Sequence, residues 1–122
     1  ETIYRVFSVT KVFTAISILQ LHEQGRLDID DPVVDHLPFF DVVYPSEESE
    51  IITIRHLLNH SSGVPDNMPE VIGWMHTEAE DEPRLDQAAF LEARFPDYAE
   101  LIYEPGDHAE YTNVGTHIRK FV

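Results

Sequence analysis

The sequence predicts a mainly α-helical chain, for three reasons. An apolar segment, residues 8–24, is followed by Gly25, a residue that commonly ends a helix. Two later segments, residues 53–58 and 85–95, carry the capping residue or the apolar spacing of helices. We find neither an internal repeat nor a convincing hairpin. With 122 residues, 43% of them hydrophobic, the chain is at most one modest domain.

The first helix is expected from about Ser8 to Gln24, and it is apolar on nearly every side. A helix of this kind is normally covered on all sides by other parts of a protein. Lys11 lies inside its apolar stretch, although lysine is almost never fully buried unless a partner pairs with it. Either the Lys11 side chain runs along the helix to reach water, or Lys11 is held beside Ser8 for chemistry.

Shorter elements follow in the next part of the chain. Asp31 is expected to cap a short helix that has Pro32 as its first residue. Thr53 is expected to cap a helix that runs to Leu58. Residues 66–84 are acidic and interrupted by prolines, which is typical of a variable loop.

Two more helices are expected in the second half. The segment 85–95 places Ala88, Leu91 and Phe95 on one helical face. Residues 115–122 begin a further helix, which we expect to continue past the end of this sequence.

The strongly acidic composition excludes several classes of partner. Asp and Glu number 23 against 8 Lys and Arg, for a formal net charge of −15. Such a surface repels nucleic acid and anionic lipid, so we expect no nucleic-acid partner. No apolar run is long enough to span a bilayer. The acid excess fits either a salt-tolerant source, in which salt screens the repulsion, or an ordinary solvated acidic surface.

The histidines and the absence of cysteine bear on metal binding. The chain has no cysteine, which excludes disulfides and thiolate metal sites. His56 and His60 have the spacing of two metal ligands on one helical face, but Leu57 stands where a zinc protease needs its glutamate. No third ligand is evident. We therefore expect neither a metal nor a cofactor.

Ser8 and Lys11 together have the properties of a nucleophile and its base. Residues three apart on a helix are neighbours, with Cβ atoms about 5–6 Å apart. The positive end of the helix dipole favours a developing alkoxide on Ser8 and disfavours the ammonium form of Lys11. Burial disfavours that ammonium as well. Both effects favour the neutral amine that a general base must be.

Three segments, in this order, carry a family resemblance. They are "SVTK" (8–11), "ITIRHLLNHSSGVPD" (52–66) and "YEPGDHAEYTNVG" (103–115). The set resembles the serine β-lactamase and penicillin-binding-protein-like superfamily, in its branch of class C β-lactamases, esterases and D-alanyl-D-alanine peptidases. The resemblance implies an α/β fold of the β-lactamase/transpeptidase type for the full-length protein. This chain is then a mainly α part of one domain, with the nucleophile helix at about 8–24 and a helical subdomain at about 26–122.

The resemblance also implies a role for each residue of the site. Ser8 would be the acylated nucleophile and Lys11 its proton partner. Tyr111 would be a second base or acid, and Asn113 would bind Lys11 and a substrate carbonyl. In the same family His60 is expected to brace the turn that contains it. Because Lys11 and Tyr111 would titrate as a coupled pair, the sequence leaves open which of them takes the serine proton.

The expected function is that of a serine hydrolase that forms a covalent acyl-enzyme on amides or esters. The substrate would be a β-lactam, a D-alanyl peptide or a small ester. The alternative is a penicillin-binding sensor without turnover, or a helical binding module that retains the motifs. The family's third motif, Lys/His-Thr/Ser/Ala-Gly, and its first strands are expected outside this sequence. The resemblance favours a periplasmic or secreted location and leaves the oligomeric state open.

Overall fold

The computed structural model describes residues 6–66 and 95–119, together with residues 2, 4, 89, 92, 93 and 122. The elements of this part are η1 (Phe7–Val9), α1 (Thr10–Glu23), α2 (Val33–His36), α3 (Ile54–Leu58), η2 (Phe95–Tyr98) and α6 (Asn113–Ile118). Among the described residues there is no strand, and two isolated bridges pair Pro32 with Thr53 and Val43 with Glu100. The prediction of a mainly helical chain is therefore confirmed for this part.

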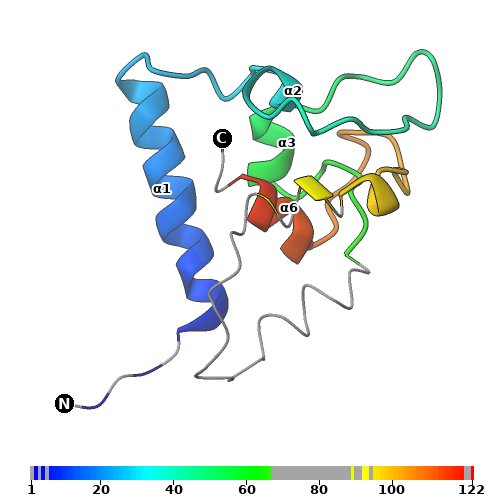
Figure 1. Cartoon of the computed structure of the whole chain (residues 1–122). Coiled ribbons are helices and arrows are strands. Elements are labelled where there is room, and N and C mark those ends of the chain that lie inside the picture. Colours follow the sequence, from blue (N-terminus) through cyan, green and yellow to red (C-terminus); the bar gives the residue numbers. More distant parts are fainter. Residues whose placement is uncertain are drawn as a thin grey trace.

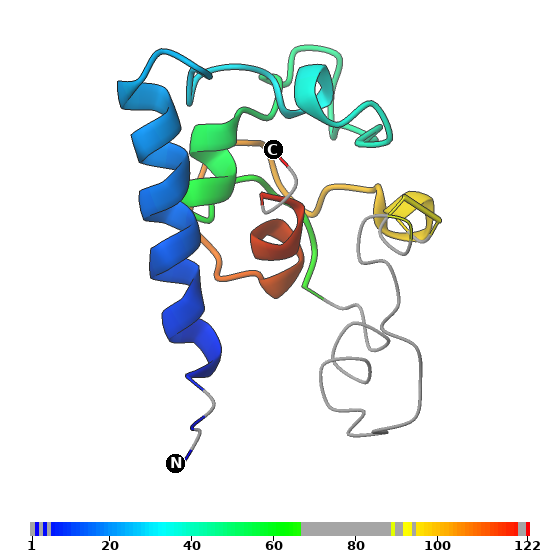
Figure 2. The same ribbon diagram turned by 60° about the vertical axis from the view of Figure 1, so that its left-hand side comes forward.

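The long helix α1 lies along one side of the molecule, and the shorter helices lie beside it (Figure 1). Helices α3 and α6 pack against each other next to α1, and α2 lies above α3 in both views (Figure 1 and Figure 2). The chain thus returns to α1 in its last part, so that α6 lies close to the helix with which the sequence begins.

The first helix has nearly the expected bounds. It begins as the 3₁₀ turn η1 and continues as α1 to Glu23, and Gly25 follows with a φ of +66°. This left-handed conformation suits a glycine after a helix end. Within the described part of the chain α1 is covered on one side only, since its single buried residue is Ile18. The exposed apolar side chains on the other sides are Val12, Phe13, Ile16 and Leu19, with Val9 just before the helix.

The expected cap of the second helix is wrong. Pro32, not Asp31, is the N-cap residue of α2, and no side chain caps this helix. The Asp31 carboxylate instead accepts a hydrogen bond from the Asp28 N–H (2.9 Å) and contacts His36 (3.2 Å). The aspartate therefore closes the turn that precedes α2, because its carboxylate binds the Asp28 N–H and not the N–H groups at the start of α2.

The prediction for α3 is confirmed. Thr53 is its N-cap, and its side chain forms a capping box with His56, whose Nδ1 accepts the Thr53 N–H at 3.1 Å. Two donors at the helix start are satisfied in this way. Ile54 and Leu57 on the inner face of α3 are fully buried.

Expectations for the second half are met only in part. Apart from Asp66, the acidic segment 66–84 lies outside the described residues, as do Ala88 and Leu91. Phe95 begins η2 and is fully buried. The last helix, α6, starts at Asn113 rather than Gly115, because Thr112 acts as its cap: the Thr112 hydroxyl accepts the Gly115 N–H at 3.2 Å. The expectation that this helix continues past the end of the sequence is wrong, since α6 ends at Ile118 and a turn follows at Arg119.

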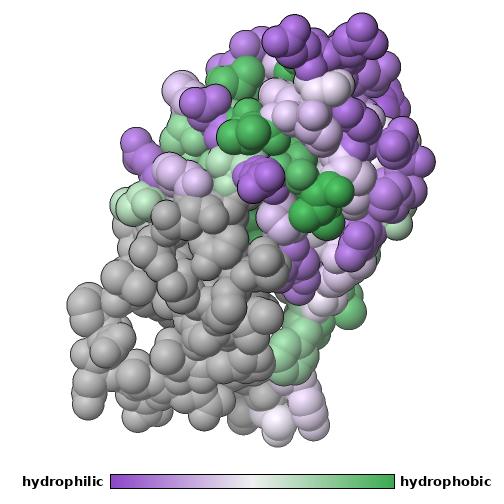
Figure 3. Space-filling view, turned by 90° about the vertical axis from the view of Figure 1, so that its right-hand side faces the viewer, coloured by the Kyte–Doolittle hydropathy of each residue, from purple (hydrophilic) through white to green (hydrophobic). Residues whose placement is uncertain are grey.

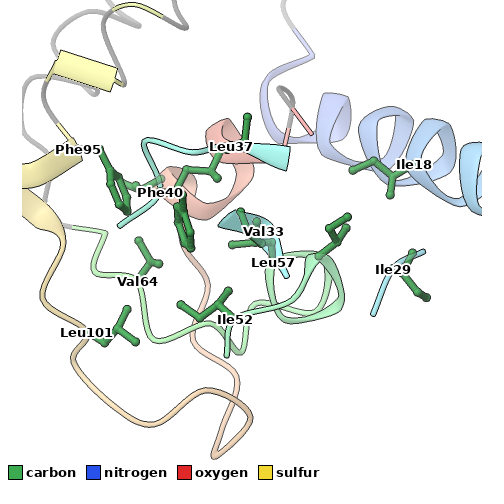
Figure 4. Close-up of a cluster of buried hydrophobic side chains, with 13 residues drawn as sticks. Ile18, Ile29, Val33, Leu37, Phe40, Ile52, Leu57, Val64, Phe95 and Leu101 are labelled. Atoms are coloured by element: carbon green, nitrogen blue, oxygen red, sulfur yellow. The ribbon is translucent and has the colours of Figure 1, made fainter. Parts of the chain in front are cut away.

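The hydrophobic core lies between α2, α3, α6 and the segment that follows η2 (Figure 4). Its largest side chains are Phe40 and Phe95, whose rings stack with centroids 4.9 Å apart. Other core residues include Ile18, Ile29, Val33, Leu37, Ile52, Ile54, Leu57, Val64, Leu101, Val114 and Ile118. This core holds α3 and α6 in place, and Ile18 attaches α1 to it.

The surface of the described residues carries both hydrophilic and apolar side chains (Figure 3). Hydrophilic side chains cover much of the described part of the face shown in Figure 3, with apolar patches between them. No helix among the described residues has the length and apolar character needed to cross a lipid bilayer.

Candidate active site

Ser8 is exposed and lies in η1, directly before α1. The residue before it, Phe7, has a φ of +42°. A non-glycine residue in this region is unusual, and such residues are often found next to functional groups. The turn leaves the Ser8 hydroxyl free to face residues from the far end of the chain.

Lys11, in the first turn of α1, connects Ser8 with α6. Its ammonium donates a hydrogen bond to Ser8 Oγ at 3.3 Å and another to Asn113 Oδ1 at 2.9 Å. The side chain is only partly buried. Lys11 therefore points at Ser8 and does not run along the helix surface away from it.

Tyr111 completes the group around Ser8. Its hydroxyl lies 2.9 Å from Ser8 Oγ, and Lys11 Nζ lies 4.9 Å from the centre of its ring. Burial raises the pKa of Tyr111. Hydrogen bonds with Lys11 and Ser8, together with the positive charge of Lys11, outweigh burial and lower that pKa below its usual value. Tyr111 therefore loses its proton more readily here than a free tyrosine does.

His60 supports the segment that carries Tyr111. Its ring stacks on the Tyr111 ring with centroids 4.8 Å apart, and its Nδ1 accepts the Thr112 N–H at 3.3 Å. Its carbonyl oxygen accepts the Glu110 N–H at 2.9 Å. Burial and the charges of Arg119 and Lys11 lower the pKa of His60, which keeps the ring neutral and its Nδ1 available as an acceptor.

The two histidines with metal-ligand spacing are engaged elsewhere. His56 and His60 each use Nδ1 to accept a backbone N–H, at 3.1 Å from Thr53 and 3.3 Å from Thr112. Within the described part of the chain, no three His, Cys, Asp or Glu side chains are grouped so that they could hold a metal ion.

A close backbone approach fixes the turn after α3. Gly63 has a φ of +77°, and a Cβ atom there would lie 2.3 Å from the Tyr103 carbonyl oxygen. The Gly63 carbonyl accepts the Ile102 N–H at 2.9 Å. Glycine is therefore required at this position, and the contact joins the 52–66 segment to the segment that leads into Tyr111.

Arg119 attaches α6 to α1. Its side chain is 3% exposed and donates a hydrogen bond from Nη2 to the Lys11 carbonyl oxygen at 3.1 Å. Burial lowers the pKa of Arg119, although the nearby Tyr111 acts in the opposite direction. This contact holds the two elements of the site at a fixed separation.

Asp66 is the residue of this site that sequence reasoning missed. Its carboxylate accepts hydrogen bonds from the Thr112 hydroxyl and from the backbone and side-chain N–H groups of Asn113. We interpreted Asp66 as the start of a variable acidic loop. The available signal was its place directly after the "SSGVP" turn, where an aspartate can cap a helix that is distant in sequence.

The four residues singled out from the sequence, Ser8, Lys11, Tyr111 and Asn113, lie within one hydrogen-bonded group. The arrangement presents an exposed hydroxyl whose proton has a phenol and an amine as neighbours. A serine hydroxyl within hydrogen-bond reach of groups that can accept its proton has the geometry that nucleophilic catalysis requires.

A family model described as Beta-lactamase matches residues 1–120 of the chain. The chain belongs to the beta-lactamase family. With the similar proteins below, this membership confirms the predicted superfamily of serine hydrolases and the β-lactamase/transpeptidase-like fold, of which this chain is a mainly helical part.

Known proteins with similar sequences are longer than this member of the beta-lactamase family. It is 34% identical over 115 residues to "Protein flp" of Staphylococcus aureus, a match covering 93% of the chain and 21% of that protein. It is 31% identical over 115 residues to "Penicillin-binding protein 4*" of Bacillus subtilis, covering 94% of the chain and 23% of that protein. The chain thus spans less than a quarter of these relatives.

The chain also matches part of several solved structures. The octameric penicillin-binding protein homologue from Pyrococcus abyssi matches with a TM-score of 0.66 and 30% identity, over 99% of this chain and 28% of that one. A D-stereospecific amidohydrolase from Streptomyces sp. matches with a TM-score of 0.62 and 31% identity, over 97% and 37%. A penicillin-binding protein from Bacillus halodurans has a TM-score of 0.59 and 36% identity, over 89% and 30%.

Proposed function

We propose that the full-length protein is a serine hydrolase that forms a covalent acyl-enzyme at Ser8. One observation carries the proposal: Ser8 Oγ lies 2.9 Å from Tyr111 Oη and 3.3 Å from Lys11 Nζ. Family membership supports the same reaction class.

In the proposed reaction Ser8 Oγ attacks a carbonyl carbon and forms a new C–O bond. The carbonyl π electrons move onto the substrate oxygen, and the serine proton passes to a neighbouring base. Collapse of this intermediate expels an amine or alcohol, which takes the proton, and leaves an ester on Ser8. Water then hydrolyses the ester by the same steps in reverse order.

Tyr111 is the better candidate for the base that takes the proton. Its hydroxyl is nearer to Ser8 Oγ than the Lys11 ammonium is, and the environment lowers its pKa. Lys11 acts as a donor toward both Ser8 and Asn113. We therefore assign to Lys11 the role of a cation that stabilises the Tyr111 phenolate, and to Asn113 that of the residue that holds Lys11 and meets a substrate carbonyl.

The proposed substrate class is an amide or ester, such as a β-lactam, a D-alanyl peptide or a small ester. The names of the similar proteins, among them penicillin-binding proteins and a D-stereospecific amidohydrolase, support this range. We also propose the division of the chain stated above, with a nucleophile helix at about 8–24 and a helical subdomain at about 26–122. The small share of each relative that the chain covers supports this partial-domain interpretation.

The test is covalent labelling of the full-length protein with a fluorophosphonate and a fluorescent penicillin. Ser8→Ala should abolish labelling. Ser17→Ala is the matched control, because Ser17 is also exposed, on the helix that follows Ser8, and its hydroxyl donates to the Phe13 carbonyl at 2.9 Å. A labelled peptide that maps to the buried Ser61 or Ser62 would contradict the proposal.

The same experiment separates hydrolase from sensor. Labelling followed by release of product identifies a hydrolase, whereas a label that persists for hours identifies a penicillin-binding sensor. A full-length protein that neither probe labels at any serine would be a binding module.

A further inference from the structure

The Asp66 carboxylate makes four hydrogen bonds to three consecutive residues. Its Oδ1 accepts the Thr112 hydroxyl (3.2 Å), the Asn113 backbone N–H and the Val114 N–H (3.2 Å). Its Oδ2 accepts the Asn113 side-chain N–H at 3.1 Å. One oxygen therefore caps the start of α6, and the other binds the side chain that contacts Lys11.

These bonds determine which way the Asn113 amide faces. A carboxylate only accepts hydrogen bonds and an ammonium only donates them. Asp66 therefore selects the NH₂ side of the Asn113 amide, and Lys11 is left with its oxygen, at 2.9 Å from Nζ. Without Asp66, the opposite orientation would bring the NH₂ group to face the Lys11 ammonium.

We propose that Asp66 is a positioning residue of the Ser8 site: by fixing the Asn113 amide, it holds the Lys11 ammonium beside Ser8 and Tyr111. The inference rests on the function proposed above and adds to it a residue other than Ser8, Lys11, Tyr111 and Asn113. Asp66 does not touch the reacting atoms and acts through Asn113 on Lys11.

The variant Asp66→Asn separates the two oxygens. Its remaining carbonyl oxygen still accepts from Asn113, Val114 and Thr112, and asparagine is as good a helix cap as aspartate. Its NH₂ group, however, stands opposite the Asn113 NH₂ group, so the Asn113 amide turns toward Lys11 with the wrong polarity. The rate constant for acylation of Ser8 should fall roughly 10- to 100-fold, as expected for the loss of one hydrogen bond to a charged group.

The test uses the full-length protein and the penicillin and fluorophosphonate probes, with acylation rates measured at saturating probe. Asp41→Asn is the matched control, since it removes the same charge from an exposed carboxylate that makes no hydrogen bond within the described part of the chain. It should acylate at the wild-type rate.

Combining Asp66→Asn with Asn113→Ala distinguishes a positioning role of Asp66 from a merely structural one. Asn113→Ala removes the side-chain amide that lies between Asp66 and Lys11, so adding Asp66→Asn should cause no further loss of acylation rate. Two residues that act independently would instead show multiplying losses. Wild-type acylation by Asp66→Asn, or a full 10-fold further loss in the Asn113→Ala background, would overturn the inference.

Amide orientation also has a readout that needs no activity. In Asp66→Asn the Asn113 NH₂ protons should show nuclear Overhauser effects to the Lys11 side chain, which wild type and Asp41→Asn should lack. If these appear while the wild-type protein is not labelled, the proposed function fails and the orienting role of Asp66 stands. If labelling occurs and the effects are absent from Asp66→Asn, the inference alone is wrong.

Discussion

At the scale of single residues, the protonation states around Ser8 depend on one another. The Lys11 ammonium lies 4.9 Å from the centre of the Tyr111 ring and donates to Ser8, which in turn contacts the Tyr111 hydroxyl. A change at any of the three therefore alters the charge that the other two experience. The observable consequence is the pH dependence of acylation.

We predict that the acylation rate rises with pH along a limb that belongs to Tyr111. Because the pKa of Tyr111 is lowered from 10.0, the phenolate forms, and the rate rises, at a pH below that value. Tyr111→Phe should remove the limb and reduce the rate roughly 10²- to 10⁴-fold. The measurement is the acylation rate constant of the full-length protein as a function of pH.

Lys11→Arg is the informative companion variant. Arginine keeps the positive charge beside Tyr111 but does not deprotonate in this range. If Tyr111 is the base, the limb should persist with a reduced rate, because the bonds to Ser8 and Asn113 are disturbed. Loss of the limb in Lys11→Arg, with the limb kept in Tyr111→Phe, would assign the proton transfer to Lys11.

The site residues differ in how far the sequence revealed them. Ser8 and Lys11 follow from helical spacing, and Tyr111 and Asn113 follow from a motif. Asp66 was not found because its bonds to Asn113 join residues 47 positions apart. Its place after the turn indicates that it can cap a helix, but which helix it caps depends on how α3 and α6 pack.

At the scale of elements, α1 is attached to the rest of the described residues through one side. Ile18 is 4% exposed, whereas Phe13 and Val12 are 64% and 56% exposed. Each large apolar side chain that is fully buried contributes about 1.5–3 kcal/mol. An apolar face of this extent favours association with another surface.

We therefore predict that the 122-residue chain expressed alone associates through α1 and is inactive. Phe13→Ser and Ile16→Ser should each weaken this association, because both side chains are exposed on α1. Gln20→Ser, at another exposed position of the helix, is the control and should not. Light scattering during size-exclusion chromatography measures the mass. A monodisperse monomer that hydrolyses nitrocefin or p-nitrophenyl esters, and loses this activity in Ser8→Ala, would contradict the prediction.

The predicted helix caps differ in outcome, and the reason lies in the partners available to each capping residue. Thr53 caps α3 because its partner His56 stands three residues later, within one turn. The helix cap expected from Asp31 was wrong because that carboxylate accepts the Asp28 N–H of the preceding turn instead. Helix α6 starts at Asn113, before the expected Gly115, because Thr112 and Asp66 both satisfy its first N–H groups. The sequence does not reveal that second cap.

At the scale of the whole molecule, the net charge of −15 acts on every element at once. Like charges on one surface repel each other and disfavour the folded state. Salt shortens the range of this repulsion, from about 10 Å at 0.1 M to about 3 Å at 1 M.

We predict that the melting temperature of the full-length protein rises as NaCl increases over this range. The rise should be similar in chloride and sulfate at equal ionic strength, because screening does not depend on the identity of the ion. A rise seen only in sulfate would instead indicate exclusion of that ion from the protein surface. A melting temperature that salt does not change would favour an ordinary acidic surface over a salt-tolerant one.

The contact between Ser8 and Tyr111 also bears on the order of folding. These residues are 103 positions apart, and Lys11 and Asn113 are 102 apart. Helices form within microseconds, whereas contacts between distant residues must first meet the entropy of closing a long loop. Lys11 is a local neighbour of Ser8, but Ser8 gains its contact with Tyr111 only after the distant parts of the chain have come together. During refolding, the time at which an acylating probe first labels Ser8 should mark the last step of folding.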